Sequence, residues 1–185
     1  MSRPYVIILN GVGSVGKTST AKALQQVVGA PLLHLSMDGF LEMLPPQMFG
    51  HPDGLVFETV DEGGHPSVVI RSGPVMARLM AGMRRAVVAM AEQGNSLVVD
   101  DVMVGGGEAE DYRRLLRGFD VYFVGLFAPL EVLEQRERAR GDRAPGLARW
   151  QYERVHLGVD YDLKIDTAQM SPAMAAETIC EAFGL

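Results

Sequence analysis

The stretch "LNGVGSVGKTST", residues 9–20, decides the fold. It contains the pattern G-x-x-x-x-G-K-[ST] as Gly11, Gly16, Lys17 and Thr18. A glycine-rich turn of this kind between a strand and a helix directs consecutive backbone N–H groups at a phosphate, and the helix N-terminus adds a partial positive charge. The apolar run "YVIIL" before it and the amphipathic segment "KTSTAKALQQVV" after it supply the strand and the helix. The sequence therefore predicts a phosphate-binding loop.

The phosphates that such a loop holds belong to a nucleotide, most simply ATP. In that interpretation Lys17 reaches the β- and γ-phosphates, and the Thr18 hydroxyl is a ligand of Mg²⁺. A glycine-rich turn without any ligand is the alternative. The predicted nucleotide-binding residues of the loop are Gly11, Val12, Gly13, Ser14, Val15, Gly16, Lys17, Thr18 and Ser19.

Strand-like and helix-like segments alternate along the whole chain. The apolar runs show little alternation of apolar and polar residues, which is typical of strands buried on both faces. The pattern predicts an α/β fold in which a parallel five-stranded sheet is covered by helices on both faces. The expected strands are 5–9, 31–35, 96–100, 121–127 and 161–165, and the expected helices are 17–28, 74–93, 108–117, 130–140 and 171–183.

Residues 45–74 depart from this alternation. They contain several glycines and prolines and two short β-like runs, "LVFETV" and "SVVIRS", around "DEGGHP". We expect a hairpin-bearing insertion, about 45–73, over the edge of the sheet. A long irregular excursion inside a compact domain is typical of a substrate lid or wall, although a surface decoration is the alternative.

Length and composition set limits on the class of protein. A chain of 185 residues is expected to form a single domain over 1–185. Its net charge of −6 argues against nucleic acid as a partner. The apolar runs are too short to span a bilayer, the first motif begins too early for a signal peptide, and a single cysteine, Cys180, allows no internal disulfide. We expect a cytoplasmic protein without a membrane partner, and its oligomeric state stays open.

Two consecutive acids end the strand "SLVVDD", and an acid at this place commonly holds the metal through water. Adjacent strand residues face opposite ways, so Asp100 and Asp101 cannot share one role. We assign Asp100 to the metal with Thr18, and Asp101 to the acceptor or the following loop. The alternative is that both acids cap the turn "VMVGGG".

The segment "EQRERARGDRAPG" is rich in arginine. Arg136 and Arg140 are four residues apart and share one helical face, and Arg143 lies beyond a glycine. Arginines on a mobile flap can neutralise the charge of a transferring phosphoryl group while excluding water. We interpret about 136–150 as a lid whose Arg136 and Arg140 bind nucleotide and take part in catalysis; a solvated charged face is the alternative.

Asp38, in "HLSMDGFLEMLP", follows the second strand at its carboxyl end, beside the phosphate loop. There it can orient an acceptor hydroxyl and take its proton. It can also serve as the N-cap of the helix "GFLEML". We assign Phe40 and the apolar residues of the insertion to an acceptor pocket, which implies a small, partly apolar or aromatic hydroxyl compound. Four histidines show no metal-binding spacing: His34, His51, His65 and His156.

With these residues in place, the sequence resembles the chloramphenicol phosphotransferase family over nearly its whole length. The resemblance is carried by "IILNGVGSVGKTS", "MDGFLEMLP", "VVDDVMVGG", "ARGDRAPG" and "YDLKIDT". It implies a three-layer P-loop kinase fold with strand order 2-3-1-4-5, and transfer of the γ-phosphoryl group of ATP, with Mg²⁺, to the primary hydroxyl of chloramphenicol. It further implies Asp38 as general base and Thr167 beside the adenine. We also place Asp101 and Val104 on the acceptor side.

The sequence departs from the family pattern over residues 48–72, a segment expected to determine specificity for the acceptor. The acceptor can therefore be another antibiotic or a metabolite, and a nucleotide-binding regulatory module is a further alternative. A shikimate-type kinase needs several arginines to hold a carboxylate, and none occurs between Asp38 and Arg71.

Overall fold

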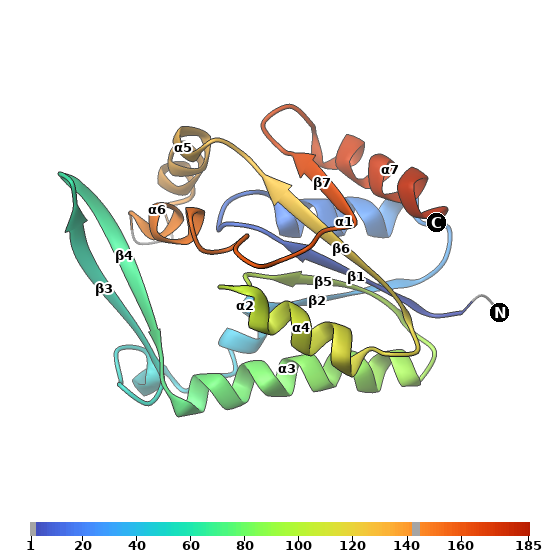
Figure 1. Cartoon of the computed structure of the whole chain (residues 1–185), viewed down its shortest axis with the longest axis horizontal. Helices are drawn as coiled ribbons and strands as arrows, with labels where there is room; N and C mark the ends of the chain where they lie inside the picture. Colours follow the sequence, from blue (N-terminus) through green and yellow to red (C-terminus); the bar gives the residue numbers. More distant parts are fainter. Residues whose placement is uncertain (1–2, 142–144) are drawn as a thin grey trace.

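The computed structural model describes residues 3–141 and 145–185, in which a central sheet lies between two layers of helices (Figure 1). None of the helices in these two ranges is long and apolar enough to cross a membrane. The elements in chain order are β1 (Tyr5–Asn10), α1 (Lys17–Val27), β2 (Leu32–Ser36), α2 (Met37–Leu41), the 3₁₀ turn η1 (Pro46–Met48), β3 (Leu55–Glu62), β4 (His65–Ser72), α3 (Pro74–Glu92), β5 (Ser96–Asp101), α4 (Gly106–Leu115), β6 (Asp120–Phe127), α5 (Leu130–Arg140), α6 (Leu147–Tyr152), β7 (Leu163–Asp166) and α7 (Pro172–Phe183).

Five parallel strands form the central sheet in the order β2-β5-β1-β6-β7. The last residue of β1, Asn10, pairs with Asp101 of β5 on one side and with Gly125 of β6 on the other. The carboxyl ends of these three strands therefore meet at one edge of the sheet. The expected order, 2-3-1-4-5, differs in its labels because it counts only the strands of this sheet, whereas β3 and β4 belong to the insertion.

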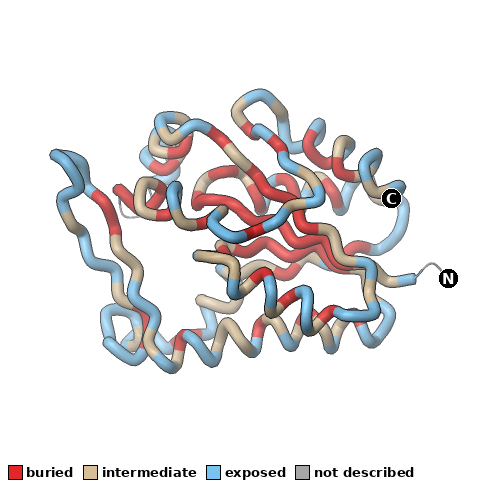
Figure 2. The backbone as a smooth tube through the Cα atoms, viewed as in Figure 1, coloured by how far each residue is buried: buried red, intermediate tan, exposed pale blue. Residues whose placement is uncertain are grey.

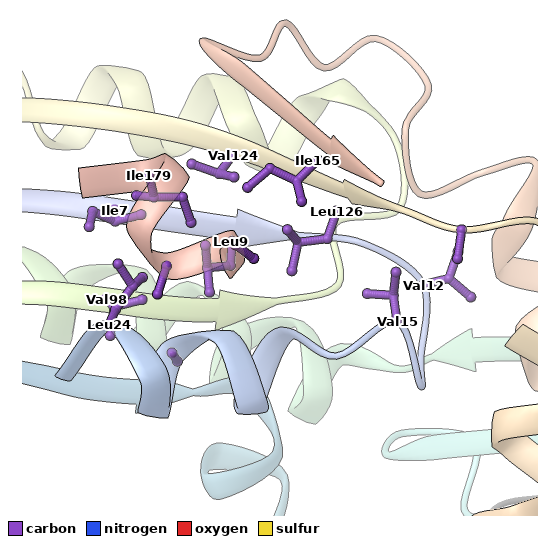
Figure 3. Packing of buried hydrophobic residues seen from close by; sticks show 14 of the residues in the cluster. Ile7, Leu9, Val12, Val15, Leu24, Val98, Val124, Leu126, Ile165 and Ile179 are labelled. Carbon is purple, nitrogen blue, oxygen red and sulfur yellow. The ribbon is translucent and has the colours of Figure 1, made fainter. Parts of the chain in front are cut away.

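Alternate residues of β1 enter two separate cores, one on each face of the sheet. Ile7 and Leu9 pack with side chains from α1 and α7, as Figure 3 shows, and Val6 and Ile8 pack with side chains from α3 and α4. All four are fully buried. The buried residues in Figure 2 accordingly concentrate along the central strands. Because both faces are covered, these strands have no solvent side, which confirms the fold class predicted from the unbroken apolar runs.

The predicted hairpin is present as β3 and β4, which pair antiparallel and form a sheet of their own. It lies beyond the carboxyl ends of the central strands (Figure 1). The hairpin contacts α6, because the Val68 N–H donates a 3.0 Å hydrogen bond to the Gly146 carbonyl oxygen. Since Gly146 directly precedes α6, the hairpin and this helix form one continuous wall.

Two local expectations need adjustment. The last strand, β7, begins at Leu163, whereas the apolar run predicted a start at residue 161. The Tyr161 hydroxyl instead hydrogen-bonds with Asn10 and His156, so this residue serves a side-chain network ahead of the strand. Helix α6 was not predicted from the sequence; it begins inside the segment interpreted as a lid and ends two residues beyond it.

The contact between the hairpin and α6 can be tested by the substitution Gly146→Ala. Gly146 has a φ of +99°, and a Cβ atom there would meet the Pro66 carbonyl oxygen at 2.4 Å. We expect a loss of about 2 kcal/mol or more in the free energy of unfolding, because a left-handed backbone costs a residue with a side chain roughly 1–2 kcal/mol and the clash adds to it. Urea denaturation measures the change.

Gly63→Ala in the hairpin turn is the matched control. Gly63 has a φ of +66°, but a Cβ atom there has open space around it. This variant should lose only about 1 kcal/mol. Equal losses in the two variants would contradict a tight contact at Gly146.

Candidate active site

Asn10, the last residue of β1, anchors the start of the phosphate loop. Its side-chain Nδ2 donates hydrogen bonds to the Val155 carbonyl oxygen, at 2.8 Å, and to the Tyr161 hydroxyl, at 2.6 Å. Its Oδ1 accepts a 2.9 Å hydrogen bond from the Met103 N–H. Asn10 is fully buried, so these bonds satisfy the whole amide group inside the protein. The loop therefore begins from a rigid point.

The loop itself, residues 11–16, bends at Ser14 and Gly16, whose φ angles are +66° and +103°. The left-handed backbone at Gly16 leads directly into α1 and favours glycine there. Both residues line a cavity of ≈350 Å³ at the N-terminus of this helix. The Ser14 hydroxyl is buried and has no hydrogen-bond partner among the described residues. An oxygen of a bound phosphate would satisfy it, so the loop fits a nucleotide.

Lys17 and Thr18 begin α1 and face the carboxyl end of β5. The Lys17 ammonium donates hydrogen bonds to the carbonyl oxygens of Gly11, at 2.9 Å, and Val12, at 3.2 Å. The Thr18 hydroxyl donates a 2.6 Å hydrogen bond to Asp100 Oδ2, and Lys17 Nζ lies 4.0 Å from Asp100 Oδ1. A hydroxyl and a carboxylate in direct contact are the oxygen ligands that Mg²⁺ prefers, so the pair fits this ion.

The electrostatic surroundings of Asp100 keep it ionised. Burial by itself would raise the pKa of this carboxyl, but the side chains of His34, Lys17 and Thr18 together hold the pKa below its ordinary value. His34 Nε2 lies 3.8 Å from Asp100 Oδ2. A charged carboxylate at neutral pH is what an association with a cation requires.

Arg136 of α5 closes the other side of the loop. It donates hydrogen bonds to the Thr167 hydroxyl, at 3.1 Å, and the Thr167 carbonyl oxygen, at 2.8 Å, and a longer one of 3.4 Å to the Val15 carbonyl oxygen. Arg136 and Thr167 line a second cavity of ≈200 Å³, which continues from the first because both are lined by Ser14, Gly16, Ser19 and Arg136. Arg140, one helical turn further, lines the larger cavity.

Asp38 lies in the first turn of α2, but it is not the cap of this helix. The Ser36 hydroxyl accepts a hydrogen bond from the Gly39 N–H and caps α2 instead. The predicted capping role is therefore wrong, since the helix begins one residue before Asp38. Asp38 lines the ≈350 Å³ cavity beside the phosphate loop and also a cavity of ≈560 Å³ on its other side.

The ≈560 Å³ cavity, called the acceptor cavity below, is enclosed mainly by apolar side chains. They come from the hairpin, from α2 and α3, and from α6. Asp101 and Val104, assigned from the sequence to the acceptor side, line it. Phe40 does not appear in its lining and packs against the core between the sheet and α3, whereas Met37 and Leu41 of the same helix line it.

Asp101 faces away from the phosphate loop, as strand alternation predicts for the neighbour of Asp100. Its Oδ2 accepts a 2.8 Å hydrogen bond from the Tyr112 hydroxyl, and its Oδ1 accepts one of 2.7 Å from the Val102 N–H. The bond from Val102 stabilises the turn that directly follows Asp101. Asp101 therefore also fulfils part of the turn-capping role that the sequence left as the alternative. Burial raises the pKa of Asp101 above its ordinary value.

Helix α6 connects the acceptor cavity to the phosphate loop, through residues that sequence reasoning missed. The Gln151 side-chain oxygen accepts a 2.7 Å hydrogen bond from the Gly13 N–H in the loop. The buried Glu137 carboxylate of α5 accepts hydrogen bonds from the N–H groups of Gly146 and Ala148, at 2.9 and 2.8 Å, and so holds the start of α6. Trp150 and Gln151 both line the acceptor cavity.

Arg84 and Glu108 also line the acceptor cavity and were not singled out in the sequence. A signal for Arg84 exists, because Met76, Met80 and Arg84 follow at intervals of four along α3 and share one face. Glu108 has no such signal, since it depends on how α4 follows β5. Arg143 of the predicted lid lies outside the described residues.

The fold has close relatives among solved kinase structures. The APS kinase of Mycobacterium tuberculosis, solved with AMPPNP and APS, aligns over 100% of both chains with a TM-score of 0.72 and 15% sequence identity. A tunicamycin resistance protein of Deinococcus radiodurans aligns over 99% of this chain and 97% of that chain, with a TM-score of 0.66 and 21% identity. At these identities the likeness concerns the fold.

Similarity in sequence identifies the family to which the chain belongs. A protein of Mycobacterium tuberculosis (strain ATCC 25618 / H37Rv) named "Putative O-phosphotransferase Rv2636" is 31% identical over 172 residues, which is 90% of this chain and 76% of the relative. The family model for chloramphenicol phosphotransferase-like proteins matches residues 4–184. The phosphate loop, the parallel sheet and these matches together identify a P-loop kinase, and the chain belongs to the chloramphenicol phosphotransferase-like family.

Proposed function

We propose that this protein transfers the γ-phosphoryl group of ATP to a hydroxyl of chloramphenicol or a closely similar antibiotic, and so inactivates the compound. The observation that carries the proposal is the meeting of two cavities at Asp38. The cavity beside the phosphate loop and the acceptor cavity share Met37, Asp38 and Val102 in their linings. A phosphate held by the loop and a hydroxyl held by the acceptor cavity would meet at this carboxylate.

The residues around the loop bind and orient the nucleotide in this proposal. ATP with Mg²⁺ supplies the phosphoryl group to be transferred. The residues 11–19 hold its phosphates, Lys17 adds positive charge, and Thr18 and Asp100 hold the metal ion. Arg136 and Thr167, whose hydrogen bonds close the second cavity, border the base.

Asp38 acts on the acceptor hydroxyl. A carboxylate at the junction of the two cavities can orient the O–H group toward the phosphate and accept its proton as the new bond forms. The Ser36 hydroxyl, and not Asp38, caps the first turn of α2.

The proposal includes a single domain over 1–185 in which two parts cover the reacting groups. The segment of about 136–150 is the lid, and Arg140 within it neutralises charge on the transferring group. The insertion of about 45–73 forms the wall of the acceptor cavity, to which Leu55, Phe57 and Ile70 contribute. Water is thereby excluded from a site where it would compete as the acceptor.

Mass spectrometry tests the reaction directly. Purified protein incubated with Mg²⁺-ATP and chloramphenicol should give a product heavier by one phosphoryl group. Asp38→Asn should lower kcat by about 10²-fold or more, because a positioned general base contributes about that much, while ATP still binds. If chloramphenicol stays unmodified, the acceptor is another compound, and other hydroxyl-bearing antibiotics and metabolites are tested next. An unchanged rate in Asp38→Asn would contradict the role of Asp38 as general base.

Lys17→Ala should lower kcat/KM by about 10²-fold or more, because the ammonium beside the loop is removed from the developing charge. Steady-state kinetics measures the loss. Lys22→Ala is the control, since Lys22 is exposed further along α1 and should keep normal turnover. Similar turnover of both variants would argue against a phosphate-binding role for Lys17.

Arg136 and Arg140 should differ in their effects. Arg136→Ala removes the hydrogen bonds to Thr167 and should mainly raise KM for ATP. Arg140→Ala should mainly lower kcat, because charge neutralisation matters most in the transition state. Arg138→Ala, at an exposed position of the same helix, is the control. Parallel losses of kcat and ATP affinity in Arg140→Ala would indicate ground-state binding alone.

A further inference from the structure

Gln151 of α6 lies between the phosphate loop and the acceptor cavity. The residue is buried, with 3% of its surface exposed, and it lines the acceptor cavity. On the other side, its Oε1 accepts the 2.7 Å hydrogen bond from the Gly13 N–H of the loop. One side chain therefore contacts both halves of the site.

The hydrogen bond to Gly13 fixes which way the Gln151 amide group points. A backbone N–H can only donate, so the amide oxygen has to face the loop and the amide nitrogen has to point away from it. Among residues 3–141 and 145–185, Gln151 Nε2 has no hydrogen-bond partner, and it is not one of the partnerless side-chain atoms that are sealed from solvent. This nitrogen is therefore open to the cavity that Gln151 lines.

Gly13 is a sensitive point of the phosphate loop, because the bend of the loop follows directly. The next residue, Ser14, has a left-handed backbone with a φ of +66°. Ser14, Gly16 and Lys17 line the ≈350 Å³ cavity, whereas Gly13 is not part of that lining. Gln151 thus holds the loop from outside this cavity. The position of Gly13 sets the direction of the N–H groups beyond the bend.

The segment that carries Gln151 is fixed at both ends. Glu137 holds the start of α6, and beyond the helix the Val155 carbonyl oxygen accepts the 2.8 Å hydrogen bond from Asn10 Nδ2. Neither Val155 nor Asn10 lines the acceptor cavity. Of these two contacts between the segment and the start of the loop, only the one through Gln151 can respond to a ligand in that cavity.

Resting on the proposed function, we propose that Gln151 is a positioning residue that couples the binding of the two substrates. Its amide nitrogen donates a hydrogen bond to an oxygen of the acceptor, while its amide oxygen holds the phosphate loop through Gly13. The bound acceptor strengthens the bond to Gly13, because an amide that donates is also a better acceptor and because its side chain loses alternative rotamers. Each substrate therefore strengthens the binding of the other by the same factor.

Such coupling favours phosphoryl transfer over hydrolysis of ATP. The loop is held most firmly when the acceptor cavity is occupied, so the nucleotide binds best in the complex that also contains the acceptor. Water in an otherwise empty cavity meets a more weakly held nucleotide. The binding energy of the correct acceptor thus helps to assemble the site.

Binding of a nucleotide that cannot be hydrolysed tests the coupling without turnover. Isothermal titration calorimetry gives Kd of Mg²⁺-AMPPNP for the unmodified protein, first alone and then with an excess of chloramphenicol. We expect chloramphenicol to lower this Kd by at least about fivefold, the lower end of ordinary coupling between two sites. Titration of chloramphenicol with and without Mg²⁺-AMPPNP should give the same factor.

Gln151→Met should bring this factor to near one, because methionine has a similar volume but no amide group. Binding of Mg²⁺-AMPPNP alone shows that the variant is folded. Gln151→Glu is a second variant, which keeps an oxygen for the Gly13 N–H but loses the donor toward the cavity, so its factor should also be near one. Gln135→Met is the matched control. It removes the same amide from an exposed position of α5 and should keep the full factor.

A factor near one in the unmodified protein, or the full factor in either Gln151 variant, would overturn the proposal. Mass spectrometry of chloramphenicol in parallel samples with ATP separates this outcome from a failure of the proposed function. Phosphorylated chloramphenicol together with a factor near one would leave the proposed function standing and refute the coupling. A factor that depends on Gln151, without phosphorylated product, would leave the coupling standing and show that the acceptor named above is wrong.

Discussion

The register between β1 and β5 is the constraint on which the site depends. Leu9 pairs with Asp100 and Asn10 pairs with Asp101, so the phosphate loop begins beside two consecutive carboxylates. Because strand residues alternate between faces, these carboxylates diverge. Asp100 meets Thr18 on the loop side, and Asp101 meets Tyr112 and the acceptor cavity. One pair of strands thus separates the side of the site where the proposed metal ion would lie from the side of the acceptor cavity.

The two cavities are joined by helix α6 as well as by the sheet. Gln151 holds the Gly13 N–H of the phosphate loop, and the carbonyl of Gly146, just ahead of the helix, holds the hairpin through Val68. Glu137 fastens the start of the same helix to α5. A short helix therefore connects the loop, the hairpin wall and the arginine-bearing helix.

The residues that line the acceptor cavity show why a shared kinase fold does not determine which compound is the acceptor. Solved relatives align with this chain over nearly their full length at 15–21% identity. The sheet and the phosphate loop serve the nucleotide. The acceptor cavity is built from the hairpin and from single positions on α3, α4 and α6, such as Arg84 and Glu108. Substitutions at such positions change charge and shape without disturbing the core, so specificity has to be argued from the cavity of each protein.

The sequence by itself determined the α/β architecture, the phosphate loop and the hairpin, because apolar runs, helical periodicity and glycine spacing act between neighbouring residues. It also separated Asp100 from Asp101 through strand alternation. Only the tertiary structure decided that Ser36 caps α2, that Phe40 turns to the core, and that Arg84, Glu108, Trp150 and Gln151 surround one cavity. These outcomes depend on how helices that are far apart in the sequence pack on the sheet. Local sequence patterns contain no information about that packing.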